Sequence, residues 1–143
     1  MWPHNLVATS LFLATVLNVA AIAKPGGDWS RTPPEVREWI ARQKQPDNPP
    51  HSCCGEADAY FADAFEVVDG QVFAIITDNR DDFPLGRPQP VGTRINVPPH
   101  KMVDSRNDVN PSGHGVIFLV NYENEKSGEY GKAVLCFVPG SGV

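Results

Sequence analysis

The hydrophobic pattern of the chain begins with one long apolar stretch, residues 6–23, which carries no charged side chain. It ends in the small residues of Ala21-Ile22-Ala23, and a polar segment with proline and glycine follows. This order is typical of a signal peptide and its cleavage site. Threonine, serine and asparagine side chains interrupt the stretch, which makes it a poor membrane span. We therefore expect residues 1–23 to be a signal peptide and residues 24–31 a flexible spacer.

An amphipathic helix is predicted directly after the spacer. Val36, Trp39 and Ile40 recur at helical spacing and form one apolar stripe. The preceding Thr32-Pro33-Pro34-Glu35 has a capping residue, prolines suited to the first turn and a carboxylate at the capping-box position. Pro46 should end the helix near Lys44. We expect a second, short helix to start at Ser52, which is a plausible cap, and to run towards Ala64.

The rest of the pattern predicts strands joined by loops. Two β-prone runs are separated by Asp69-Gly70, which is a strong signal for a two-residue hairpin. Long polar loops are expected at residues 77–92 and 98–115. The predicted strands cover residues 65–68, 71–76, 93–97, 116–120 and 133–138. Strands grouped after helices favour an α+β fold, with an N-terminal helix and a small antiparallel sheet or half-barrel of about five strands. Residues 32–143 should form a single domain.

Charge and length limit the function classes. Cleavage after Ala23 leaves 143 − 23 = 120 residues, enough for one core. The formal net charge is −5 and the charges are dispersed, which argues against nucleic acid or an anionic membrane as partner. No second apolar run is long enough for a stable membrane span after processing. We expect a periplasmic or extracellular protein whose partner is an unknown envelope protein or a small ligand, bound through the long loops.

Three cysteines make one disulfide and one free thiol the default in an oxidising compartment. A bridge between the adjacent Cys53 and Cys54 would be strained, so Cys136 should pair with one of the two. Neighbouring side chains point in different directions, and the sequence does not say which of the two points inward. We take Cys54 as the partner of Cys136, which leaves Cys53 as the candidate free thiol.

Two chemical alternatives involve these cysteines. His51, Cys53 and His114, together with Cys54 and His100, are candidate ligands for Cu(I) or Zn(II), although no paired Cys-x-x-Cys spacing is present. Cys54 before a helix and His114 before a strand have the order of a papain-like hydrolase, but no third group that orients the histidine is identifiable.

No catalytic residue is therefore assigned, and no cofactor is expected. The prediction is a non-enzymatic binding or envelope-accessory module. The alternative is a metal-binding protein or thiol enzyme that uses the unpaired cysteine.

Two short motifs resemble a group of small, uncharacterised exported proteobacterial proteins: Cys53-Cys54-Gly55 and Leu135-Cys136-Phe137-Val138-Pro139. Many members of that group carry a further cysteine after the first motif and another on the penultimate strand. This chain has Asp58-Ala59 and Gly115-Val116-Ile117 there, so a second bridge is missing. The resemblance implies export and disulfide formation, and it implies no activity.

Overall fold

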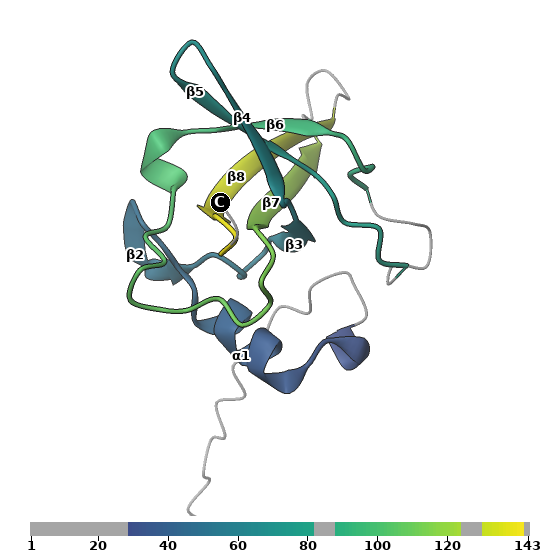
Figure 1. The fold of residues 1–143 in the computed structure, drawn as a ribbon, viewed down its shortest axis with the longest axis vertical. Coiled ribbons are helices and arrows are strands. Elements are labelled where there is room, and N and C mark those ends of the chain that lie inside the picture. Colours follow the sequence, from purple (N-terminus) through teal and green to yellow (C-terminus); the bar gives the residue numbers. More distant parts are fainter. Residues whose placement is uncertain (1–28, 82–87, 124–129, 142–143) are drawn as a thin grey trace, which may run out of the picture.

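The computed structural model describes residues 29–81, 88–123 and 130–141 (Figure 1). The predicted signal peptide and most of the predicted spacer lie outside these residues. The elements in chain order are η1 (Trp29–Arg31), α1 (Pro34–Arg42), β1 (Lys44–Gln45), β2 (Asn48–Ser52), β3 (Asp58–Phe61), β4 (Ala64–Val68), β5 (Gln71–Ile75), β6 (Arg94–Val97), η2 (Pro99–Lys101), β7 (Val116–Glu123) and β8 (Tyr130–Val138).

The strands of the described residues form three antiparallel sheets, with the orders β1-β2, β3-β7-β8 and β4-β5-β6. The prediction of an α+β fold on one sheet of about five strands is therefore wrong: the part of the chain that the structure describes is mostly β, with one short α-helix. Apolar runs had located most of the strands, but such runs do not say which edges pair. The strands β1 and β2 were missed because their residues are polar or proline and almost all exposed.

The second predicted helix, from Ser52 towards Ala64, is also wrong. Part of this segment is strand β3, which pairs with β7 in the register Ala59↔Phe118 and Tyr60↔Ile117. Ala59 and Tyr60 are both buried, on opposite faces of the strand. A strand buried on both faces shows no polar alternation, and pairing with β7 overrides the helical preference of the alanines in the segment.

Helix α1 has the predicted buried stripe of Val36, Trp39 and Ile40. Its start differs from the prediction, because Pro33 is the N-cap residue and no side chain caps the helix. The carbonyl of Pro33 instead accepts hydrogen bonds from the N–H groups of Val36 and Arg37. The helix ends at Arg42, slightly before the predicted end, and the chain then becomes extended.

The predicted hairpin is confirmed. Asp69 (φ +50°) and Gly70 (φ +76°) both have positive φ between β4 and β5, and Val68 pairs with Gln71 across the turn. The strands predicted at 93–97, 116–120 and 133–138 correspond to β6, β7 and β8.

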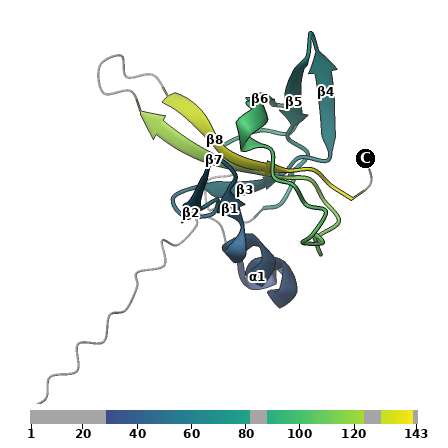
Figure 2. The ribbon, with the colours of Figure 1, turned by 90° about the vertical axis from the view of Figure 1, so that its left-hand side faces the viewer.

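The β3-β7-β8 sheet is the middle layer of the molecule (Figure 2). Val116 and Phe118 of β7 point to one face, where α1 contributes Trp39 to the core. Ile117 and Leu119 point to the other face and pack against residues of β5 and β6. The two cores therefore share one sheet, and the β4-β5 hairpin projects from the far layer (Figures 1 and 2).

Candidate functional site

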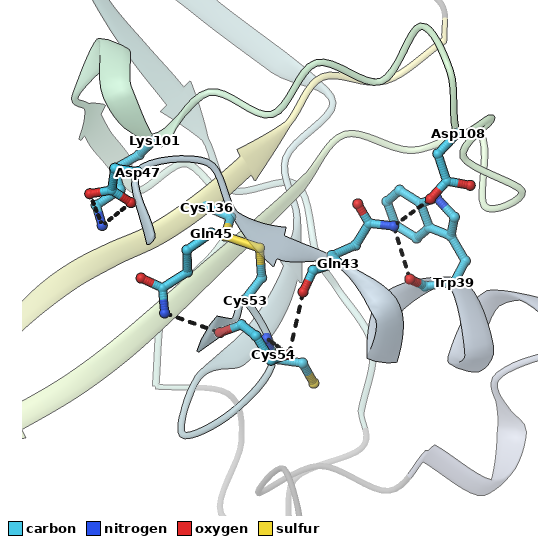
Figure 3. Close-up of a disulfide and its surroundings, with 10 residues drawn as sticks. Trp39, Gln43, Gln45, Asp47, Cys53, Cys54, Lys101, Asp108 and Cys136 are labelled. Atoms are coloured by element: carbon cyan, nitrogen blue, oxygen red, sulfur yellow. Dashed lines mark hydrogen bonds and ion pairs between the residues drawn. A yellow bond between two sulfur atoms is a disulfide. The ribbon is translucent and has the colours of Figure 1, made fainter. Parts of the chain in front are cut away.

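The disulfide joins Cys53 to Cys136, with the two Cα atoms 5.6 Å apart. Both side chains are fully buried in the core beneath α1. The assignment of Cys54 as the bridging residue and of Cys53 as the free thiol is therefore wrong. The N–H of Cys53 donates to the carbonyl of Gln43 at 2.9 Å. The sulfur of Cys54 points away from the bridge (Figure 3).

The free thiol of Cys54 is half-buried, and its surroundings do not activate it. Burial raises its pKa above the ordinary value of 9.0, and the charge of Asp58 raises it further. Thiolate chemistry requires the opposite shift. Cys54 precedes β3 and His114 precedes β7, and these strands run antiparallel, so the two residues lie towards opposite ends of the strand pair. The structure does not bring together the pair that a papain-like site needs.

Polar clamps surround the bridge (Figure 3). The buried amide of Gln43 donates to the carbonyl of Trp39 at 3.0 Å and to Asp108 at 2.9 Å. Arg42 forms an ion pair with Asp108 at 2.8 Å. Hydrogen bonds from Arg42 and then from Gln43 lower the pKa of Asp108. These contacts fasten the end of α1 to the loop that contains Asp108, so they hold the disulfide region in place.

A second clamp lies on the other side of the bridge. Lys101 of η2 forms an ion pair with Asp47, in the turn between β1 and β2, at 2.8 Å. The hydrogen bond from Lys101 lowers the pKa of Asp47. Both clamps connect secondary structure to loops, and neither leaves an unpaired charge that points into a cavity.

The candidate metal ligands do not converge. His51 is exposed on β2, the sulfur of Cys53 is bonded to Cys136, and His114 lies before β7. Within residues 29–81, 88–123 and 130–141, no group of three or more histidine, cysteine, aspartate or glutamate side chains is placed to hold a metal ion.

His114 instead belongs to a cluster that the sequence did not reveal. Its Nδ1 atom lies 2.9 and 3.0 Å from the two carboxylate oxygens of Asp63. Asp63 also accepts hydrogen bonds from the N–H of Gly115 and from the hydroxyl of Thr77, each at 3.0 Å. The imidazole stacks on the ring of Phe61, with 4.2 Å between the ring centroids. Asp63 is thus the orienting group that sequence reasoning could not identify, because it is 51 residues away in the chain.

The same cluster extends to the start of the predicted long loop. The guanidinium of Arg80 lies 4.0 Å from the centroid of the Phe61 ring. Arg80 also forms an ion pair with the buried carboxylate of Asp78 at 2.6 Å. Asp78 also accepts a hydrogen bond from the N–H of Phe61. The charged groups of the cluster are thus paired with one another. The cluster connects the segment between β3 and β4 to two loops.

A different surface is formed by strand β4. Every residue of this strand is exposed. Phe65, Val67 and Val68 are 38%, 61% and 45% exposed. Phe65 pairs with Ala74 and Val67 pairs with Val72, and directly paired residues share one face of a sheet. Ala74 is fully buried in the core. Phe65 and Val67 therefore lie on the same side of the sheet as the core residues, but at a place where the sheet extends past the core and is exposed to solvent.

The sequence carried no sign of this exposure, because β4 reads like any half-buried strand of a hairpin. The predicted binding surface was the long loops, and the hairpin was predicted only as scaffold. Exposure of apolar side chains that continue a core is a feature of interaction sites. We therefore treat the apolar side of the β4-β5 hairpin, defined by Phe65 and Val67, as the candidate functional site.

No helix in the part of the chain that the structure describes is long and apolar enough to cross a membrane. Comparison of the chain with protein-family models, with curated proteins and with solved structures finds no match.

Proposed function

We propose that this protein is an exported binding module that recognises another polypeptide through the β4-β5 hairpin. The observation that carries the proposal is the exposure of Phe65 and Val67 on the side of the sheet that elsewhere faces the core. Export is supported by the apolar stretch at residues 6–23 and by a fully buried disulfide, which forms in oxidising compartments.

The two faces of the hairpin differ, and the difference selects the binding face. On the outer face, Glu66 forms an ion pair with Arg94 at 2.7 Å. Arg94 also lies 4.6 Å from the ring of Phe73, and Asn96 donates to Gln71. The polar side chains of this face therefore bond to one another. On the other face, the apolar side chains of Phe65 and Val67 are exposed to water. Covering them with apolar side chains of a partner is favourable.

Backbone geometry adds a second attraction for a polypeptide. Strand β4 is at the end of its sheet and pairs only with β5. Among the described residues, no backbone group bonds to its other edge. An open edge next to exposed apolar side chains is the arrangement to which an extended peptide adds as a further strand.

The test uses Phe65→Thr/Val67→Thr and a matched control, Val91→Thr/Val109→Thr, which also removes two exposed apolar side chains (59% and 78% exposed). Each purified protein is immobilised and exposed to an envelope extract of the organism that makes it. We expect the wild type and the control to retain the same proteins and the hairpin variant to lose them. Melting curves check folding, and the hairpin variant should melt close to the wild type because neither side chain is buried. Equal retention by all three proteins would refute the proposal.

A further inference from the structure

The open edge of β4 presents its hydrogen-bonding groups at the two residues that carry the exposed apolar side chains. In a two-residue hairpin the pair that flanks the turn, here Val68 and Gln71, is hydrogen-bonded, and bonded and non-bonded pairs alternate from there. Phe65 and Val67 therefore belong to non-bonded pairs with β5. Their N–H and C=O groups point away from β5, towards the open edge.

This arrangement is self-complementary. When a second copy of β4 is placed antiparallel beside the first, with Glu66 opposite Glu66 of the copy, Phe65 lies opposite Val67 of the copy, and Val67 lies opposite Phe65. All the outward N–H and C=O groups of these residues then have partners, four hydrogen bonds in total by the alternation of an antiparallel ladder. Shifting the strands by one residue in either direction breaks both Phe–Val pairs.

Side chains favour the same register. An aromatic ring beside a β-branched side chain is a stabilising cross-strand pair, and the two-fold axis produces that pair twice on the core-facing side. On the outer face, Val68, which is 45% exposed, is covered by Ala64 of the copy. The two glutamates at the axis are like charges in direct opposition, which opposes association. Their ion pairs with Arg94 at 2.7 Å reduce this repulsion without removing it.

We propose that the partner of the β4 edge is a second copy of this chain, so that two three-stranded sheets join into one six-stranded sheet across a two-fold axis. The inference rests on the proposed function, because it names the polypeptide that the hairpin binds. One short strand pair is a small contact compared with the roughly 800 Å² per partner of a stable complex. The dimer therefore forms in a concentration-dependent equilibrium. Figure 2 shows β4 as the outermost strand of its sheet, with β5 and then β6 to its left.

Sedimentation of the mature protein over a wide range of concentration measures this equilibrium. We expect Phe65→Thr/Val67→Thr to raise the dissociation constant on the order of tenfold or more, because both cross-strand pairs are lost. Glu66→Gln should lower it roughly two- to fivefold, because the repulsion at the axis disappears. Val91→Thr/Val109→Thr should leave it unchanged. A higher affinity of Glu66→Gln would distinguish this register from non-specific hydrophobic association.

Cross-linking tests the axis directly. In a Cys54→Ser background, Glu66→Cys places one thiol beside its copy in a non-bonded pair, with Cα atoms about 4.5 Å apart, a separation that a disulfide spans. We expect rapid formation of a disulfide-linked dimer on oxidation. Val109→Cys, at an exposed loop position, should cross-link far more slowly. A monomer at every concentration, together with equally slow cross-linking of the two cysteine variants, overturns the inference.

The two proposals fail separately. If the wild type stays monomeric but retains envelope proteins that the hairpin variant loses, the hairpin binds a different polypeptide and only the self-association is wrong. If the wild type is monomeric and the hairpin variant also retains the same proteins as the wild type, both are wrong.

Discussion

The carbonyl of Gln43 accepts a hydrogen bond of 2.9 Å from the N–H of Cys53, so the residue that follows helix α1 directly positions the disulfide. The side-chain amide of Gln43 is buried and contacts Trp39 and Asp108. One residue thus connects the helix, the bridge and a loop more than 60 positions away in the chain.

The bridge should contribute much of the stability. Replacing Cys53 and Cys136 together by alanine is expected to lower the free energy of unfolding by roughly 2–5 kcal/mol, because the bridge closes a long loop in the unfolded chain. Chemical denaturation of the double variant measures this loss. Cys54→Ser is the control and should change the midpoint very little. A loss at Cys54→Ser as large as that of the double variant would contradict the pairing.

The thiol of Cys54 should react slowly at neutral pH. Burial and the charge of Asp58 raise its pKa, so the thiolate becomes abundant only above pH 9.0, the ordinary value. The rate of modification by a thiol-specific reagent, followed from neutral to alkaline pH, reports this pKa. Asp58→Asn should shift the rate profile to lower pH, since it removes the neighbouring negative charge. A midpoint below the ordinary value in the wild type is incompatible with the surroundings described here.

The Arg42–Asp108 ion pair should make the stability of the protein depend on pH in the acidic range. Hydrogen bonds hold the pKa of Asp108 below 3.8 in the folded chain, so the clamp contributes stability above that pH. The contribution is lost as the pH falls through the folded-state pKa. The melting temperature of the wild type should therefore fall more steeply below pH 3.8 than that of Asp108→Asn. Parallel curves for the two proteins would show that the ion pair has no net effect, as is common for exposed pairs.

Gly115 should not tolerate a side chain. A Cβ atom at this position would lie 2.2 Å from the carbonyl oxygen of Ala62, which is backbone and cannot rotate away. Gly115→Ala is expected to cost about 1–3 kcal/mol, in the range of overpacking substitutions. Gly55→Ala is the matched control, because its Cβ would meet nothing closer than 3.9 Å. Equal melting temperatures for the two variants would indicate that the backbones of residues 62 and 115 are farther apart.

Local signals in the sequence predicted the local structure. The Asp69-Gly70 turn is determined by the conformations its two residues accept, and the stripe of α1 is determined by the spacing of Val36, Trp39 and Ile40. The pairing of Cys136 with the Cys53-Cys54 dipeptide also followed from local geometry, because adjacent cysteines do not bridge easily. The first two predictions depended on residues close together in the chain, and the third depended on the strain of a bridge between adjacent cysteines.

The features that were missed depend on distant residues. The bridging cysteine is Cys53 because its side chain lies in the core with Cys136, and the strand at Ala59 and Tyr60 is made by pairing with β7. The orientation of His114 is set by Asp63. The exposure of Phe65 and Val67 arises because the hairpin extends past the core, and no property of the strand itself records where the core ends.

The 83 positions between Cys53 and Cys136 also set an order of events. A chain made from its N-terminus presents the two adjacent cysteines long before Cys136 exists. Within this sequence, the thiols that precede β8 belong to neighbouring residues that pair poorly with each other. Correct oxidation therefore has to wait until β8 is made, and any catalyst of oxidation that acts earlier would have to be released from Cys53 or Cys54 before the native bond can form.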